Sequence, residues 1–153
     1  MHRRSACAGL VLASLFAPSF SHAAERATPE EAKALAQKAA AHLVQVGPQK
    51  AIADFMDPAA GFVDRELFVI VYGPDNKILC GYGVPVLTGK DATTLKDVEG
   101  REFGKDIIAL AKSQGSGWVD YRMTNPATKK VGLKTSWVIR SGDYVVFVGA
   151  FKA

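Results

Sequence analysis

The sequence predicts an α+β domain in which a long N-terminal helix packs on an antiparallel sheet of about five strands. Apolar residues recur at helical spacing from Pro29 to Val46. Two strand-like segments near the middle of the chain are separated by a turn, and three more follow toward its end. The long connection between the two groups carries another helical pattern, which predicts a helical layer over the sheet.

Residues 1–23 have the features of a signal peptide. Arg3 and Arg4 supply a positive charge, residues 5–20 are mostly apolar, and a small-x-small pattern ends at Ala23. The apolar stretch is short for a membrane span, which needs about 20 residues. We therefore expect cleavage after Ala23 and a single periplasmic or secreted domain over residues 24–153. An uncleaved membrane anchor is the alternative.

The first helix has clear start and stop signals. Thr28 suits the N-cap, Pro29 the first helical position, and Glu31 completes a capping box with Thr28. Gly47 and the proline after it end the helix. A second, short helix is expected from Gln49 to Met56, where apolar residues again recur at helical spacing.

The first pair of strands runs from Leu67 to Tyr72 and from Lys77 to Tyr82, joined by a turn into a hairpin. The first strand is apolar at both its odd and its even positions, so other parts of the chain must cover both faces of the sheet. The N-terminal helix covers one face. The connection from Gly83 to Ser116, with a helix from Phe103 to Lys112, is expected to cover the other as a lid.

Three more strands are predicted, from Trp118 to Met123, Val131 to Ile139 and Tyr144 to Phe151. The odd positions of the middle strand are mostly apolar and are expected to face the helix-packed core. The even positions, which include Lys134, are expected to face either solvent or a pocket under the lid.

Charge and cysteine content exclude several classes of function. The chain carries a net charge of +4, which removal of Arg3 and Arg4 lowers by two. So mild a charge argues against nucleic acid as a partner. His42 and Cys80 are the single histidine and cysteine after residue 23. They provide neither an internal disulfide nor a zinc site, so we expect a buried thiol, no metal and no cofactor.

Motifs of known catalytic sites are also missing. Gly115-Ser116-Gly117 does not match the G-x-S-x-G motif, and Gly83 to Lys90 has the wrong spacing for a P-loop. These observations favour a binding domain over an enzyme. A Tyr–Lys pair that acts as acid and base is the remaining catalytic alternative.

Several short segments occur in an order and spacing that resemble one known family. They are Gly61-Phe62-Val63-Asp64, Gly89-Lys90-Asp91, Leu95 to Gly100, Phe103-Gly104-Lys105, Gly117 to Tyr121, Asn125-Pro126, Lys134 to Trp137 and Val148 to Phe151. Together they resemble the single Cache family, extracytoplasmic sensor domains related in shape to PAS domains. The chain is similar to stand-alone secreted members, which carry no signalling output of their own.

The resemblance implies a curved sheet with a ligand pocket between the sheet and its lid. It also implies that the ligand is a small organic acid or related metabolite. Such domains are usually attached to kinases or chemoreceptors. The sequence departs from the family where Tyr-x-Trp is common, because Met123 replaces the tryptophan.

The expected ligand-binding residues are Tyr82, Trp118, Tyr121, Met123 and Lys134. Lys134 supplies a cation and Tyr121 a hydroxyl on the neighbouring strand, which is what a carboxylate needs. Trp118 and Tyr82 are expected to wall the pocket.

A second hypothesis is a protein-interaction module without a small ligand. It would dock on a membrane-bound kinase or chemoreceptor, or on its own copy as a homodimer through the N-terminal helix. An exposed apolar strip on Pro29 to Val46, together with a filled pocket, would favour it.

Overall fold

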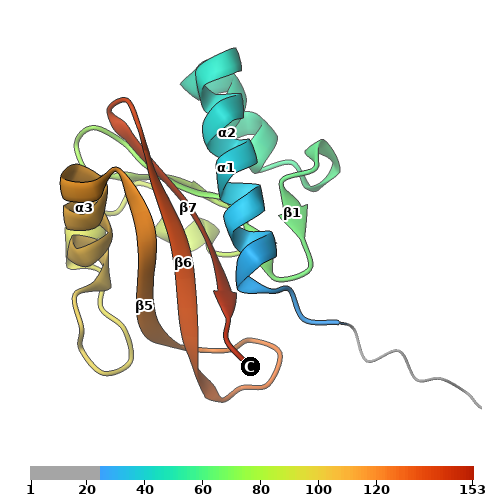
Figure 1. Cartoon of the computed structure of the whole chain (residues 1–153), viewed down its shortest axis with the longest axis vertical. Helices are drawn as coiled ribbons and strands as arrows, with labels where there is room; N and C mark the ends of the chain where they lie inside the picture. The colour runs from blue at the N-terminus through green and yellow to red at the C-terminus, as the bar shows by residue number, and fades with distance from the viewer. Residues whose placement is uncertain (1–24) are drawn as a thin grey trace, which may run out of the picture.

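The computed structural model describes residues 25–153. The predicted signal peptide and its cleavage site lie outside these residues. Figure 1 shows a sheet with α1 on one face and α3 on the other. This is the predicted α+β arrangement of helix, sheet and helical lid. Between residues 25 and 153, no helix combines the length and the apolar character that crossing a membrane requires.

The main sheet has five antiparallel strands in the order β4-β3-β7-β6-β5. Their bounds are Ile70–Tyr72 for β3, Ile78–Gly81 for β4, Ser116–Thr124 for β5, Val131–Ser141 for β6 and Tyr144–Phe151 for β7. The predicted strand from Leu67 to Tyr72 is interrupted. Its first part, β2 (Leu67–Phe68), pairs with β1 (Val63–Asp64), because Arg65 adopts a left-handed φ of 54° and turns the chain back.

α1 (Pro29–Val46) has the bounds that the sequence predicts. The Glu31 N–H donates to Thr28 Oγ1 at 3.2 Å, and the Thr28 N–H donates to Glu31 Oε2 at 2.7 Å. Three alanines on the inner face of α1 have no exposed surface, which lets the helix lie close to β6 and β7. The helix ends at Gly47, and α2 (Pro48–Phe55) follows.

Each face of the sheet has its own apolar core. The core under α1 and α2 includes Phe55, Val71 and Val148, and the core under the lid includes Tyr72, Phe103 and Phe147. Cys80 is buried in the first core, as predicted, and burial raises the pKa of its thiol to about 12. The thiol is therefore protonated at neutral pH.

The lid consists of two 3-10 helices, η2 (Pro85–Leu87) and η3 (Ala92–Thr94), and of α3 (Phe103–Gln114). It also binds both edges of the sheet. At β4, the Ile78 N–H donates to the Lys90 carbonyl at 2.9 Å, and the Gly89 N–H donates to the Ile78 carbonyl at 2.7 Å. At β5, the Val98 N–H donates to the Arg122 carbonyl at 3.1 Å.

Candidate functional site

Lys134 and Tyr121 lie opposite each other on β6 and β5 and share the face of the sheet under the lid. Met123 lies two residues further along β5 on the same face. The odd positions of β6, such as Trp137 and Ile139, pack on the other face against α1. The predicted division of β6 between helix-packed and lid-facing positions is therefore confirmed.

The Lys134 side chain is half-buried in apolar surroundings. Its Nζ atom lies 5.3 Å from the ring centre of Phe68 and 5.3 Å from that of Phe151. Among residues 25–153, no hydrogen bond or ion pair engages this ammonium. Burial lowers the pKa of Lys134 to about 8, against a smaller opposing effect of Glu66. At neutral pH the site therefore holds a cation that forms no ion pair within residues 25–153, and Glu66 acts on it from a longer distance.

Tyr121 is buried beside this cation. Its hydroxyl and Ser136 Oγ share a hydrogen bond of 2.8 Å, and its ring stacks on Phe103 with centres 4.3 Å apart. Burial raises the pKa of Tyr121 to about 12, partly offset by Ser136. The Tyr121 and Ser136 hydroxyls therefore both stay protonated at neutral pH, and the two together offer a hydroxyl donor next to Lys134.

Four residues of this site were not predicted. Ser136 is two positions from Lys134 on the same strand, and strand alternation could have identified it. Phe68 and Phe151 come from other strands, so their place beside Lys134 depends on the strand order. Gly149 is opposite Ser136 on β7, and a Cβ there would lie 2.8 Å from Lys134 Cε.

Trp118 and Tyr82 were expected to wall the pocket, but neither lies beside Lys134 and Tyr121 in the structure. Trp118 is three residues from Tyr121 on β5, so it points to the opposite face of the sheet. It packs edge-on against Trp137, with ring centres 5.0 Å apart. Tyr82 follows β4 in a turn and remains 40% exposed.

The lid segment before α3 is attached to β5 through Asp97. Its carboxylate accepts hydrogen bonds of 2.9 Å from the backbone N–H groups of Arg122, Arg101 and Glu99. The Arg122 bond contributes most to lowering the pKa of Asp97 below its ordinary value. The Arg101 guanidinium adds a bond of 2.7 Å to the Asp120 carbonyl. These contacts hold the lid over Tyr121.

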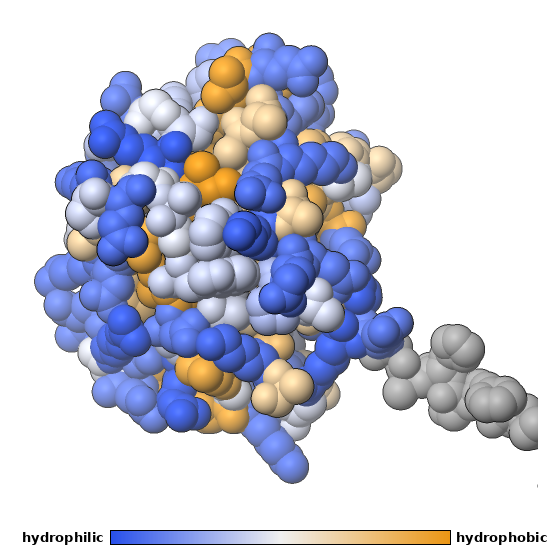
Figure 2. Space-filling model, viewed as in Figure 1, coloured by the Kyte–Doolittle hydropathy of each residue, from blue (hydrophilic) through white to orange (hydrophobic). Residues whose placement is uncertain are grey.

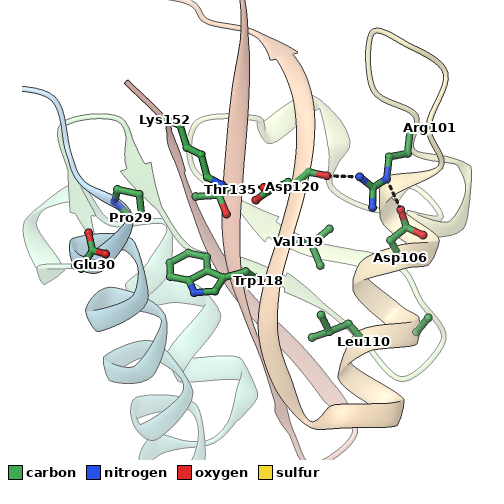
Figure 3. Close-up of a pocket in the computed structure, with 11 residues that line it drawn as sticks. Pro29, Glu30, Arg101, Asp106, Leu110, Trp118, Val119, Asp120, Thr135 and Lys152 are labelled. Atoms are coloured by element: carbon green, nitrogen blue, oxygen red, sulfur yellow. Dashed lines mark hydrogen bonds and ion pairs between the residues drawn. The ribbon is translucent and has the colours of Figure 1, made fainter.

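A hollow lies around the β5 edge and has a volume of about 630 Å³. We call it the edge groove. Figure 3 shows its lining, which comes from the start of α1, from α3 and the loop before it, from β5 and β6, and from Lys152 after β7. The polar residues are Glu30, Arg101, Asp106, Asp120, Thr135 and Lys152, and Trp118 is the aromatic one. Neither Lys134 nor Tyr121 lines it.

Comparison with known proteins places this arrangement in a family. A sequence model described as the Cache domain matches residues 29–152. The chain belongs to the Cache domain family. The resemblance found in the sequence is thereby confirmed, and so is the fold that it implied.

A curated relative and three solved structures are similar to this Cache domain. Methyl-accepting chemotaxis protein McpP of Pseudomonas putida is 33% identical over 70 residues, which is 40% of this chain and 13% of that protein. A solved structure described as "Structural basis for carboxylic acid recognition by a Cache chemosensory domain" has a TM-score of 0.66 and 22% identity, covering 81% of this chain and 92% of the other.

The other two structures show the same fold. A periplasmic sensor domain of a chemotaxis protein has a TM-score of 0.62 and 20% identity over 81% of this chain and 90% of the other. A methyl-accepting chemotaxis protein from Vibrio parahaemolyticus has a TM-score of 0.64 and 18% identity over 80% of this chain and 86% of the other.

Proposed function

We propose that this Cache domain is an extracytoplasmic sensor domain that binds a small carboxylate under the lid without transforming it. The observation that carries the proposal is the Lys134 ammonium, half-buried between two phenyl rings and unpaired among the described residues. A desolvated cation is costly unless an anion compensates it. A carboxylate ligand would supply that anion.

The surrounding residues suit a small organic acid. One carboxylate oxygen would accept a bond from Lys134, and the second would accept one from the Tyr121–Ser136 hydroxyl pair. Phe68 and Phe151 would contact the apolar part of the ligand. Binding would favour the conformation in which the lid is closed, by population shift.

The relatives support this class of ligand and this role. One of the similar structures is that of a Cache chemosensory domain that recognises carboxylic acids, and McpP is a methyl-accepting chemotaxis protein. We propose the same sensory role for this chain, with a membrane-bound kinase or chemoreceptor as its partner. Residues 1–23 would direct the domain out of the cytoplasm and be removed after Ala23.

A thermal-shift screen with acetate, pyruvate and succinate tests the proposal at pH 7. A ligand at about 100 times its dissociation constant adds roughly 2.7 kcal/mol to the free energy of unfolding, which raises the melting temperature by several degrees. Lys134→Met should abolish the shift. Lys130→Met removes an exposed lysine from the turn before β6 and should leave the shift unchanged.

The same screen should depend on pH in a defined direction. The charged form of Lys134 binds the carboxylate, and its pKa is about 8. Affinity should therefore be nearly constant between about pH 6 and pH 7, where the carboxylate is ionised and Lys134 is charged, and fall up to about tenfold per unit above pH 8. Affinity that stays constant up to pH 10 would contradict the role given to Lys134.

Gly149→Ala tests the space that the ligand site requires. The added Cβ would overlap Ser136 Oγ and would lie 2.8 Å from Lys134 Cε, so at least one of the two side chains must move. We expect the lysine to be displaced and carboxylate affinity to fall by about tenfold or more. Ala127→Gly, in the exposed turn before β6, is the control and should leave the affinity unchanged. Unchanged affinity in Gly149→Ala would place the ligand elsewhere.

A screen with no response to any carboxylate would favour the protein-interaction module. The exposed large apolar residues of α1 are Val44 and Val46 at its end. In Figure 2 the apolar colour on this face of the molecule occurs in separate spots among polar residues. The surface that this alternative requires is therefore small on the face shown.

A further inference from the structure

The Lys134 amine has the surroundings of a nucleophile as well as those of a charged anchor. Its Nζ atom lies 5.3 Å from the ring centre of Phe68 and 5.3 Å from that of Phe151. No hydrogen bond or ion pair with any of residues 25–153 engages the nitrogen. When it loses its proton, its lone pair therefore has no partner among these residues and is free to attack a carbon atom.

The Lys134 nitrogen is also open to a small molecule. Among residues 25–153, the side-chain polar atoms that are closed to solvent and lack a partner belong to Tyr72, Asp120 and Trp137. Lys134 Nζ is not one of them, so it keeps exposed surface although the side chain is half-buried. Gly149 on β7 adds no side chain beside the lysine, since a Cβ there would lie 2.8 Å from Lys134 Cε. A small ligand can therefore reach the nitrogen from solvent.

Burial gives this amine a free lone pair near neutral pH. The pKa of Lys134 is about 8, against 10.5 for an ordinary lysine, because desolvation disfavours the ammonium more than Glu66 favours it. At pH 7 the uncharged fraction is therefore roughly a tenth, about 300 times that of an ordinary lysine. Tyr121, the titratable group opposite Lys134 on β5, stays a neutral hydroxyl at this pH because burial raises its pKa to about 12.

The hydroxyl pair next to Lys134 can polarise a carbonyl group. Tyr121 Oη and Ser136 Oγ share one hydrogen bond of 2.8 Å, so one of their two hydrogens remains free to bond a ligand oxygen. A hydrogen bond to a carbonyl oxygen stabilises the negative charge that develops there when a nucleophile attacks the carbon. The amine and the hydroxyl donor thus come from adjacent strands and share the face under the lid.

We propose that Lys134 Nζ forms a reversible imine with the carbonyl carbon of a small α-oxo acid. The inference rests on the carboxylate site proposed above and names the class of acid that fits it. The uncharged nitrogen attacks the carbonyl carbon and forms the C–N bond, and the π pair moves to the oxygen, which takes up the proton that the nitrogen releases. Loss of water gives the imine, and its protonated form places a positive charge beside the ligand carboxylate. Addition of water returns the amine and the acid unchanged, so the step needs no oxidant or reductant.

Reductive trapping with cyanoborohydride, followed by peptide mapping, tests the imine at pH 7 in the unmodified protein. Pyruvate should add a reduced adduct to Lys134 at least about tenfold faster than to Lys130, an exposed lysine in the turn before β6. Lactate, which has the same charge but no carbonyl group, should give no adduct and should compete with pyruvate. Pyruvamide, which keeps the carbonyl group but lacks the charge, should label Lys134 more slowly.

Two variants separate the imine from the charge and from the hydroxyl donor. Lys134→Arg keeps a cation but has no nucleophilic amine, because a guanidinium stays protonated. It should retain the thermal shift with lactate and lose the adduct. Tyr121→Phe should slow the labelling of Lys134 by about tenfold. Tyr82→Phe, at an exposed tyrosine away from the site, is the matched control and should leave the rate unchanged.

The imine and the carboxylate site can fail separately. A thermal shift with lactate, together with no adduct of pyruvate on Lys134, would overturn the imine and leave the carboxylate site in place. Equal labelling by pyruvamide and pyruvate, without a thermal shift with lactate, would overturn both the choice of α-oxo acids and the carboxylate site. Equal labelling of Lys134 and Lys130 would also overturn the inference, because the site would then confer no reactivity on its lysine.

Discussion

Lys134→Met should stabilise the unliganded protein at pH 7 by about 2 kcal/mol. The lysine ammonium is partly desolvated between Phe68 and Phe151 and has no neutralising partner among the described residues. Methionine keeps the unbranched side chain and fills the same apolar space without the charge. The variant should therefore gain stability while it loses the carboxylate site.

The sign of this effect follows from the two pKa values of Lys134. The pKa is about 8 in the folded protein and 10.5 in an ordinary setting. Below pH 8 both states are protonated, so the cost of the buried charge is fully present. Between about pH 8 and pH 10.5 the unfolded chain binds more protons, so the stability of the unmodified protein rises with pH. The variant lacks this rise.

Urea denaturation at pH 7 and pH 9.5 measures both effects. The full pKa difference corresponds to roughly 3 kcal/mol, and partial exposure of the side chain reduces it to about 2. Lys130→Met, at an exposed position, should change the free energy of unfolding by less than about 0.5 kcal/mol. A loss of stability in Lys134→Met at pH 7 would show that the ammonium is compensated within the protein.

Gly104→Ala should destabilise the protein by about 3 kcal/mol. Gly104 is in the first turn of α3, where alanine would ordinarily stabilise a helix relative to glycine. Here, however, a Cβ would collide with the carbonyl oxygen of Ala92 and lie 3.1 Å from Leu95 Cβ. The backbone oxygen of η3 cannot move away without separating the two parts of the lid.

Thermal denaturation of Gly104→Ala measures this cost against a control on the same helix. Ser113→Ala, at an exposed position of α3, should be neutral or gain up to about 0.5 kcal/mol. If Gly104→Ala were as stable as the control, the close approach of α3 to η3 would not contribute to the packing of the lid.

Local rules predicted much of this fold. The capping box at Thr28 and the stop at Gly47 gave both ends of α1, because both signals act within a few residues. Alternation along the strands placed Tyr121, Met123 and Lys134 on one face. The same rule places Trp118 on the opposite face of the sheet from Tyr121.

The remaining part of the candidate site depends on non-local pairing. Phe151 lies beside Lys134 because β7 pairs with β6, and Phe68 reaches the same point from β2. Neither neighbour is encoded near Lys134 in the sequence. The edge groove is still less predictable, since it joins the start of α1 to α3 and to Lys152 near the chain end.

The hydrogen bonds between the lid and the outer strands have a consequence for the behaviour of the protein at high concentration. An open sheet presents unpaired backbone groups at both edges, which can recruit strands from other molecules. Here one connection occupies backbone groups of Ile78 at one edge and of Arg122 at the other. Substitutions that detach the lid would therefore expose both edges together, and aggregation would accompany the loss of ligand binding.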